Sequence, residues 1–304
     1  MTPLVPLQTI LKADHGSKIE IESSPYKVGT SDTIGRRETM EDEIVVKGTL
    51  YAVFDGHGGK NAALLCSHVL DIVFEESTKE SKEMKEVFAL CFNKLHQQIV
   101  SSRIKSGTTA LISYIDQDDS SLWVAHVGDS RAVLFADGKA VRLTEDHKPN
   151  SQSEKKRVIS EGGKITHRLF SKVYRVNDTL SITRALGKKN FITFFYFLFF
   201  IFFYFYIIFY FILFFTFIFN FFFLLFFLLG DQDFQKYGIT HSPEVSGPHS
   251  IKNAEFIILA CDGLWDVISD KKACALIRKE NDPNVQATML REFAFKKGSS
   301  DNIR

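Results

Sequence analysis

The sequence predicts a layered domain of strands and helices, and two kinds of apolar pattern support this fold class. Residues 50–54 and 256–260 are continuous apolar runs of strand length, and each is followed by turn residues. Another set of apolar residues recurs at helical spacing, which predicts a helix with one face in the core: Met84, Phe88, Cys91, Leu95 and Ile99. Strands and helices mixed along one chain pack as stacked layers around hydrophobic cores.

The remaining elements follow in chain order. A helix is expected over residues 60–74, directly after the first strand and its Asp-Gly turn. Residues 111–115 are β-branched and aromatic, which predicts a core strand, and turns at 116–121 and 137–138 separate further strands up to residue 144. Ser151 and Glu154 form a capping-box pattern for a helix that Gly162-Gly163 ends. Two late helices are expected over 270–279 and 283–297.

Composition bounds the class of protein. Lys and Arg total 37 and Asp and Glu total 36, so the net charge of +1 gives no basic field for nucleic acid. The 4 cysteines form no CxxC pair, which favours reduced thiols, and Cys261 is expected to be a buried strand thiol. Residues 1–22 are interpreted as a short leader without a secretory signal. These features favour a cytoplasmic or nuclear location.

Two predicted strands end in an Asp-Gly pair, and this suggests a metal site. Asp55-Gly56 follows the first apolar run, Asp262-Gly263 follows the late one, and Asp301 lies near the C-terminus. A single Asp-Gly pair is typical of an ordinary turn. Carboxylates gathered at one sheet edge, without a Cys or His pair at ligand spacing, favour Mg²⁺ or Mn²⁺ over Zn²⁺.

An ordered series of short motifs extends from about residue 27 to residue 304. The motifs are Gly35-Arg36-Arg37-Glu38-Thr39-Met40-Glu41-Asp42, Asp55-Gly56-His57-Gly58-Gly59, Ser106-Gly107-Thr108-Thr109-Ala110, Val127-Gly128-Asp129-Ser130-Arg131-Ala132, Leu143 to Pro149, Leu180 to Gly187 and Cys261-Asp262-Gly263. The whole series resembles the metal-dependent protein phosphatases of type 2C, a serine/threonine phosphatase family. The fold that this resemblance implies is α+β, a four-layer α-β-β-α sandwich of two antiparallel sheets flanked by helices, with the catalytic domain over residues 23–304.

The resemblance also implies roles for single residues. Asp55 would bridge two Mg²⁺ or Mn²⁺ ions, Glu41 and the carbonyl of Gly56 would bind one of them, and Asp262 and Asp301 would bind the other. A weaker third ion would lie between Asp129 and Asp262.

Three further residues would serve the reaction itself. Asp42 would orient the attacking water. Arg37 would grip the substrate phosphate, and His57 would act as general acid for the departing serine or threonine oxygen. A hydroxide that bridges the two ions would attack phosphorus in line, without a phosphoenzyme. Phosphorylated proteins are the expected substrates, and a monomer is the expected state.

Other polar residues in the motifs are interpreted as structural. The hydroxyls of residues 106–109 precede a core strand, and His147 is expected to be a turn histidine satisfied by backbone groups. For Arg131 two readings stay open, a salt bridge that orders the Asp129 loop and an ordinary solvated arginine.

One hydrophobic segment does not fit this domain. Residues 191–229 contain 20 phenylalanines and no charged residue, which is long enough for a membrane span. A single span would place Asp55 and Asp262 on opposite sides of the bilayer. Removing residues 188–230 joins Gly187 to Asp231 and restores an Arg-Ala-x-Gly-Asp pattern typical of the family. We therefore interpret 188–230 as an insertion, with a translated intron as its hypothetical origin.

The chain stops where the family would continue into a final strand, so the predicted sandwich lacks that strand. This stop predicts that Asp301 is poorly held near a frayed end and that the 304-residue chain folds poorly or has weak activity. Two hypotheses remain: a metal-dependent phosphatase, and a catalytically inactive, membrane-tethered phosphatase-like binding module.

Overall fold

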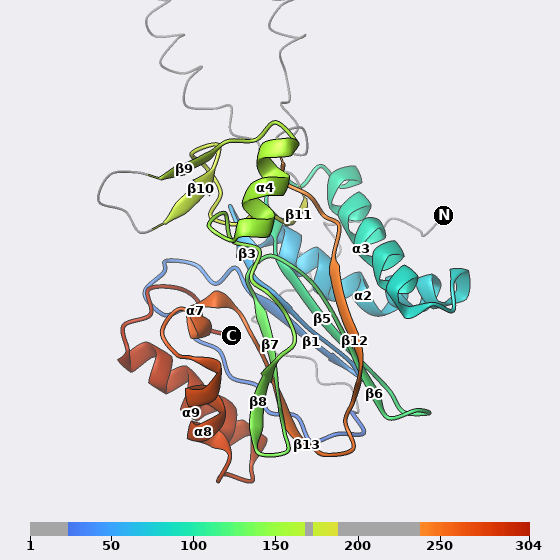
Figure 1. Ribbon diagram of the computed structural model, residues 1–304, viewed down its shortest axis with the longest axis vertical. Helices are drawn as coiled ribbons and strands as arrows, with labels where there is room; N and C mark the ends of the chain where they lie inside the picture. Colours follow the sequence, from blue (N-terminus) through green and yellow to red (C-terminus); the bar gives the residue numbers. More distant parts are fainter. Residues whose placement is uncertain (1–23, 168–172, 188–237) are drawn as a thin grey trace, which may run out of the picture.

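The strands of the computed structural model, which describes residues 24–167, 173–187 and 238–304, form two antiparallel sheets that pack on one another (Figure 1). The larger sheet has the strand order β1-β2-β5-β6-β12 and the smaller one the order β13-β7-β8. The larger sheet consists of Glu43–Lys47 (β1), Leu50–Phe54 (β2), Ala110–Asp116 (β5), Ser121–Val127 (β6) and Glu244–Ser250 (β12). The smaller sheet consists of Arg131–Ala136 (β7), Lys139–Arg142 (β8) and Ala254–Ala260 (β13).

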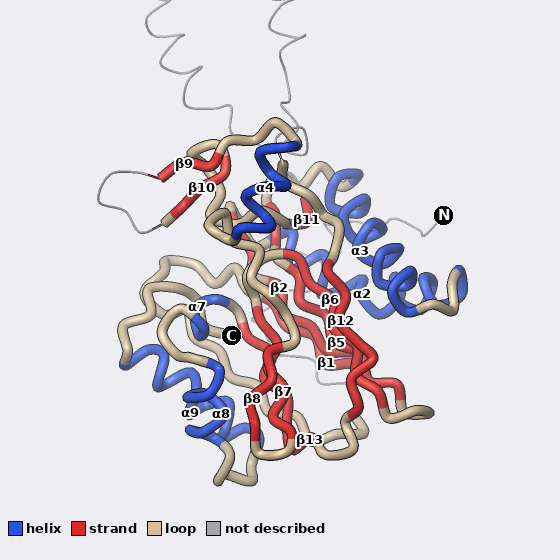
Figure 2. Tube along the Cα trace, viewed as in Figure 1, coloured by secondary structure: helices blue, strands red, loops and turns tan. Residues whose placement is uncertain are grey.

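Helices cover the outer faces of both sheets, which confirms the predicted four-layer α-β-β-α arrangement (Figure 2). Asn61–Glu80 (α2) and Met84–Ser101 (α3) pack on the larger sheet. Asp270–Ile277 (α8) and Pro283–Lys296 (α9) pack on the smaller sheet, next to the four-residue helix Asp262–Trp265 (α7).

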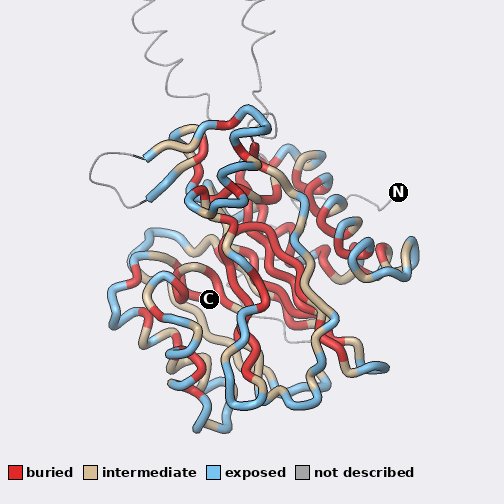
Figure 3. The backbone as a smooth tube through the Cα atoms, in the orientation of Figure 1, coloured by how far each residue is buried: buried red, intermediate tan, exposed pale blue. Residues whose placement is uncertain are grey.

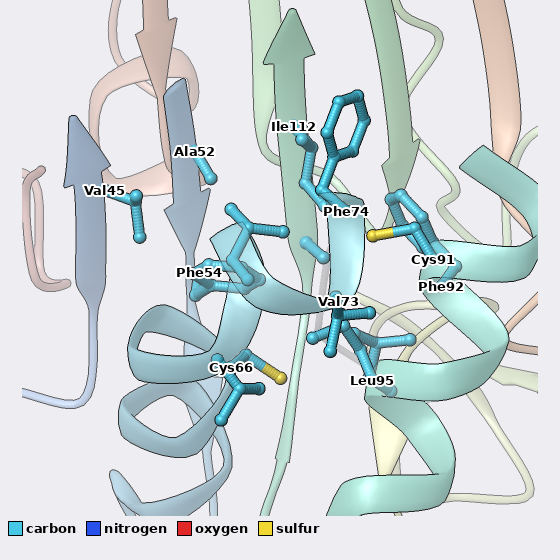
Figure 4. Close-up of a cluster of buried hydrophobic side chains, with 14 of the residues drawn as sticks. Val45, Ala52, Phe54, Cys66, Val73, Phe74, Cys91, Phe92, Leu95 and Ile112 are labelled. Carbon is cyan, nitrogen blue, oxygen red and sulfur yellow. The ribbon is translucent and has the colours of Figure 1, made fainter. Parts of the chain in front are cut away.

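Strand β2 shows why the central layer is almost wholly apolar. All five of its residues are buried, because both of its faces are covered (Figure 3). Ala52 and Phe54 pack toward α2 and α3, in the cluster drawn in Figure 4, whereas Tyr51 and Val53 pack toward the smaller sheet. A continuous apolar run, rather than an alternating one, is therefore the expected sequence for this strand.

The structure corrects one local prediction, the capping box. Ser151 is the N-cap residue of Gln152–Ser160 (α4), but its hydroxyl lies 3.1 Å from Ser153 Oγ and caps no backbone N–H. The Glu154 carboxylate binds elsewhere, as described below. The end of α4 is as predicted, since Gly162 has a φ of +84° and Gly163 N donates to Val158 O.

The other predicted elements differ mainly at their ends. Helix α2 ends at Glu80 instead of residue 74, because its buried face continues to Ser77, whereas α8 and α9 start at the predicted residues and end slightly earlier. The turn at Asp137-Gly138 is confirmed, with φ of 51° and 70°.

Shorter elements surround one end of the sandwich. Ile165–His167 (β9) and Tyr174–Val176 (β10) form a hairpin beside α4 (Figure 1). Gly56–His57 (β3), Gly107–Thr108 (β4) and Leu186–Gly187 (β11) form a small sheet of order β11-β4-β3. No helix in the described ranges is both long and apolar enough to cross a membrane. The predicted leader and the insertion at 188–230 lie outside those ranges.

Candidate metal centre

Asp55 directly follows β2, and neighbouring hydroxyl residues hold its backbone. Its N–H donates to Thr109 Oγ1 at 3.2 Å, and its carbonyl accepts from Thr109 N at 2.8 Å and from Thr108 Oγ1 at 3.1 Å. Ser106 Oγ accepts from Ala62 N at 3.1 Å, in the first turn of α2. The structural role predicted for these hydroxyls is confirmed, and their effect is to fix the backbone that carries Asp55.

Asp129 lies in the turn between β6 and β7, where the chain crosses from one sheet to the other. The preceding Gly128 has a φ of +104°, and a Cβ there would lie 2.5 Å from Thr109 Cγ2. His147 holds the same turn, because Gly128 N donates to His147 Nδ1 at 3.1 Å and His147 N donates to Gly128 O at 3.0 Å. The prediction of a turn histidine held by backbone groups is confirmed for Nδ1, whereas Nε2 faces a side chain and lies 3.5 Å from Glu244 Oε2.

Asp262 follows β13 and starts α7. Gly263 packs so closely on the C-terminal residues that a Cβ would lie 1.8 Å from Asn302 O. The preceding Cys261 is buried, as predicted, but it is the N-cap residue of α7 and not part of β13, and burial raises the pKa of its thiol.

Asp55, Asp129 and Asp262 form a compact carboxylate cluster in which one oxygen from each lies within 4.8 Å of the others. Burial, followed by the neighbouring carboxylates, raises the pKa of Asp55 and of Asp262 well above the ordinary range. Burial also raises the pKa of Asp129 to about 6, against the opposing charge of Lys148. Lys148 Nζ lies 3.5 Å from Asp129 Oδ2 and 2.9 Å from Asp266 Oδ1. The three carboxylates are therefore costly to ionise together without a cation.

The donor set fits a hard divalent cation. All three groups present carboxylate oxygens, which Mg²⁺ and Mn²⁺ prefer. The buried Asp262 Oδ1 finds no hydrogen-bond partner among the described residues, so it is available as a ligand.

A cavity of about 460 Å³ opens above this cluster, and most of the other predicted site residues line it. Glu41 is held at its wall by Gly59 N, which donates to Oε2 at 3.1 Å, and by Thr39 Oγ1 at 3.3 Å from Oε1. Gly56 packs against the Glu41 backbone, where a Cβ would lie 2.3 Å from the carbonyl oxygen. The predicted residues that line the cavity are Arg37, Glu41, Asp55, Gly56, His57, Asp129, Asp262 and Asp301.

His57 lies in β3, opposite Gly107 of β4. A Cβ on Gly107 would lie 2.4 Å from His57 Nε2, so the glycine leaves the space that the imidazole occupies. The small sheet β11-β4-β3 thus positions the predicted general acid at the cavity wall.

Arg37 and Asp301 form an ion pair at the cavity mouth. Arg37 also donates from Nε to Ser300 O at 3.3 Å, and its side chain is 56% exposed. The predicted phosphate-binding residue and one predicted metal ligand therefore contact each other directly.

Asp42 is the one predicted site residue that does not line the cavity. It is 2% exposed, it contacts Cys261, and its Oδ2 has no hydrogen-bond partner among the described residues. Burial, opposed by Cys261 and Arg304, raises the pKa of Asp42 to about 7.

The predicted fraying around Asp301 is wrong, because the last residues are tied to three parts of the domain. Thr33 and Ile303 exchange two backbone hydrogen bonds of 3.0 Å, and Cys261 N donates to Arg304 O at 3.0 Å. Asn302 Nδ2 donates to Ile34 O at 2.9 Å and to Thr39 O at 3.0 Å, and Glu41 N donates to Asn302 Oδ1 at 3.0 Å. The backbone around Asp301 is therefore anchored.

Arg131 forms salt bridges, which excludes the reading as an ordinary solvated arginine, although its partners are Asp146 and Asp270 rather than residues of the Asp129 turn. Its guanidinium binds Asp146 Oδ2 at 2.6 Å and Asp270 Oδ1 at 2.7 Å, and it lies 5.2 Å from the centre of the Trp265 ring. It therefore joins β7 to α8 and α7.

Comparisons with known proteins are consistent across most of the chain. A family profile described as Protein phosphatase 2C matches residues 22–303. "Probable protein phosphatase 2C 7" of Oryza sativa subsp. japonica is 30% identical over 90% of this chain and 63% of its own length. "Protein phosphatase 2C homolog 1" of Saccharomyces cerevisiae is 29% identical over 96% of this chain and 97% of its own length. The chain spans 48% of another rice relative, so it covers about half to two thirds of these plant proteins.

Solved structures share the fold. A structure described as a C. elegans sex determining protein superposes with a TM-score of 0.69 at 21% identity, over 91% of this chain and 64% of that chain. Serine-threonine phosphatase 2C from Toxoplasma gondii superposes with a TM-score of 0.62 at 19% identity, over 90% of this chain and 91% of that chain. At these identities the structural comparison supports the fold.

Proposed function

Because the chain belongs to the protein phosphatase 2C family, we propose that it is a metal-dependent protein phosphatase that hydrolyses phosphoserine and phosphothreonine in protein substrates. The observation that carries the proposal is the cluster of Asp55, Asp129 and Asp262 at the floor of an open cavity. A phosphoryl group brought into this cavity would meet bound cations below it and Arg37 at its mouth.

We assign the cation ligands as follows. Asp55 would hold two Mg²⁺ or Mn²⁺ ions, one together with Glu41 and the Gly56 carbonyl and the other together with Asp262 and Asp301. Asp129 with Asp262 provides a weaker third site. Cations bound there would activate water near neutral pH and would stabilise the charge that develops on the phosphoryl oxygens.

The remaining steps belong to side chains. Arg37 binds the phosphate with its planar set of donors, for which it must share its guanidinium with Asp301. His57 donates a proton to the departing serine or threonine oxygen. Asp42, behind the cavity wall, orients the attacking water. No side chain is required to form a covalent intermediate.

Replacing Asp55 tests this proposal. With Mn²⁺ and p-nitrophenyl phosphate or a phosphothreonine peptide, we expect Asp55→Asn to lower kcat/KM at least about a thousandfold, because the shared ligand is lost. Asp137→Asn is the matched control, since Asp137 lies in an exposed hairpin turn at φ 51°, a conformation that Asn also tolerates. Wild-type protein that binds Mn²⁺ but hydrolyses neither compound would contradict the proposal.

The alternative, an inactive membrane-tethered binding module, gains no support from the described residues. The cavity retains seven predicted side chains together with the Gly56 backbone, and no described helix could span a membrane. The monomeric state and the cytoplasmic location stay predictions.

A further inference from the structure

We propose that Glu154 is a positioning residue that fixes one wall of the catalytic cavity. This inference rests on the proposed function, since it concerns how the same cavity keeps its shape. Glu154 lies in the first turn of α4, and its side chain is only 4% exposed. Its Oε1 accepts from Arg184 Nη2 at 2.6 Å, and its Oε2 accepts from Arg157 Nη2 at 2.8 Å and from Thr183 Oγ1 at 2.5 Å.

The contact with Thr183 connects Glu154 to the cavity. Residues 180–182 line the cavity, and Thr183 follows them directly. Thr183 N donates to His147 O at 2.9 Å, and its carbonyl accepts from Arg157 Nη2 at 3.0 Å. Thr183, at the end of the cavity wall, is therefore held by hydrogen bonds to three residues. Glu154 and Arg157 provide two of these partners, and His147 is the third.

Arg157 and Arg184, the two arginines that bind Glu154, also bind a second segment of the chain. Arg157 Nη1 donates to Gly238 O at 3.0 Å, and Arg184 Nη1 donates to Ser242 O at 3.2 Å. Arg184 also forms a parallel bridge with Thr240, and Ala185 N donates to Thr240 O at 3.0 Å. One buried carboxylate thus joins α4 to residues 183–185 and to residues 238–242.

The electrostatics keep this carboxylate charged. Burial alone would raise the pKa of Glu154, but the hydrogen bonds from Arg184, Arg157 and Thr183 outweigh it and hold the pKa well below the ordinary range. Loss of the charge would leave two partly buried guanidinium groups without their shared partner. Glu154 is not one of the described residues that line the cavity, so it acts through the wall and not on the substrate.

The test uses the full chain and two substrates of different size. We expect Glu154→Gln to raise the KM for a phosphothreonine peptide about tenfold, because a loosened wall no longer matches the peptide. The kcat for p-nitrophenyl phosphate and the dissociation constant for Mn²⁺ should change less than about twofold, since the cation ligands lie on other elements. Glu161→Gln is the matched control, because Glu161 binds the same Arg157 at 2.9 Å but is 43% exposed.

Two further measurements keep the test decisive. Thr183→Val removes the hydroxyl contacts with Glu154 and with His147 O but keeps both ion pairs of Glu154, so we expect a smaller KM increase in the same direction if Glu154→Gln fails to fold. Hydrogen exchange of the amides of residues 180–184 should quicken in Glu154→Gln but not in Glu161→Gln, whether or not the protein is active. The inference would be overturned if Glu154→Gln changed neither the amide hydrogen exchange of residues 180–184 nor the KM for the peptide. It would also be overturned if the variant lost activity equally on both substrates and lost Mn²⁺ binding. Failure of wild-type turnover alone would instead contradict the proposed function.

Discussion

At the scale of single residues, the site depends on glycines that leave room for other groups. Gly107→Ala should lower kcat about tenfold or more without weakening Mn²⁺ binding, because the added Cβ would lie 2.4 Å from His57 Nε2 and displace the proposed general acid. Steady-state kinetics and calorimetric Mn²⁺ titration would measure the two effects.

The control for this substitution is Gly48→Ala. Gly48 has a φ of +57° and nothing within 4 Å of an added Cβ, so the change should cost about 1 kcal/mol of stability through backbone strain alone. If Gly48→Ala lowered kcat as much as Gly107→Ala, the displacement of His57 would not be the cause.

The raised pKa values in the cluster predict that cation binding releases protons. Near pH 6, Asp129, with a pKa of about 6, is partly protonated in the metal-free protein, and Mn²⁺ binds the ionised form. Apparent Mn²⁺ affinity should therefore fall as the pH falls through about 6. Calorimetric titrations in two buffers of different ionisation enthalpy measure the release, and Asp129→Asn should release fewer protons. Equal proton release by the wild type and by Asp129→Asn would show that Asp129 is not a titrating part of the site.

At the scale of elements, the C-terminal residues act as a clamp between the segment before β1 and the strand β13. Asn302→Ala should destabilise the domain by about 2 kcal/mol, because it removes three partly buried hydrogen bonds, which the buried Asn302 side chain makes with the backbone of Ile34, Thr39 and Glu41. It should also weaken Mn²⁺ binding, since Glu41 and Asp301 lose their anchor. Urea unfolding and Mn²⁺ titration test both effects.

Asn284→Ala provides the comparison for this prediction. The hydrogen bond of its side chain is a long, exposed one, from Thr30 N to Oδ1 at 3.4 Å, so its loss should change stability by less than about 0.5 kcal/mol. Similar losses of unfolding free energy in Asn302→Ala and Asn284→Ala would mean that the contacts of Asn302 make no specific contribution to stability.

The elements also show which features a sequence can predict. Asp55 and Asp262 were predictable because an apolar run followed by Asp-Gly is a local pattern. The role of Asn302 was not, because its partners lie more than 250 positions away in the chain. Glu154 was interpreted as a cap from its local spacing, whereas long-range contacts with Thr183 and Arg184 decide its role. The pairing of Arg37 with Asp301 likewise exists only after folding.

At the scale of the whole molecule, the cluster requires both sheets to pack together. Asp55 follows a strand of the larger sheet, Asp262 follows a strand of the smaller sheet, and Asp129 lies in the turn that joins them. The two sheets share the core formed by residues such as Val53, Leu111 and Leu134. Cation binding should therefore report on the folding of the entire sandwich.

This requirement gives a test of the hydrophobic segment. The residues before and after 188–237 contact each other directly, through the Arg184–Thr240 bridge and the hydrogen bonds of Arg157 with Gly238 and of Arg184 with Ser242. The domain can therefore fold without the segment. Deleting residues 188–230 should leave Mn²⁺-dependent turnover intact and raise soluble yield, because an uncharged sequence with 20 phenylalanines favours aggregation. Sequencing the transcript across this region would show whether Gly187 joins Asp231 directly. A deletion variant that neither folds nor binds Mn²⁺, together with a transcript that always encodes the segment, would mean that the segment belongs to the working protein.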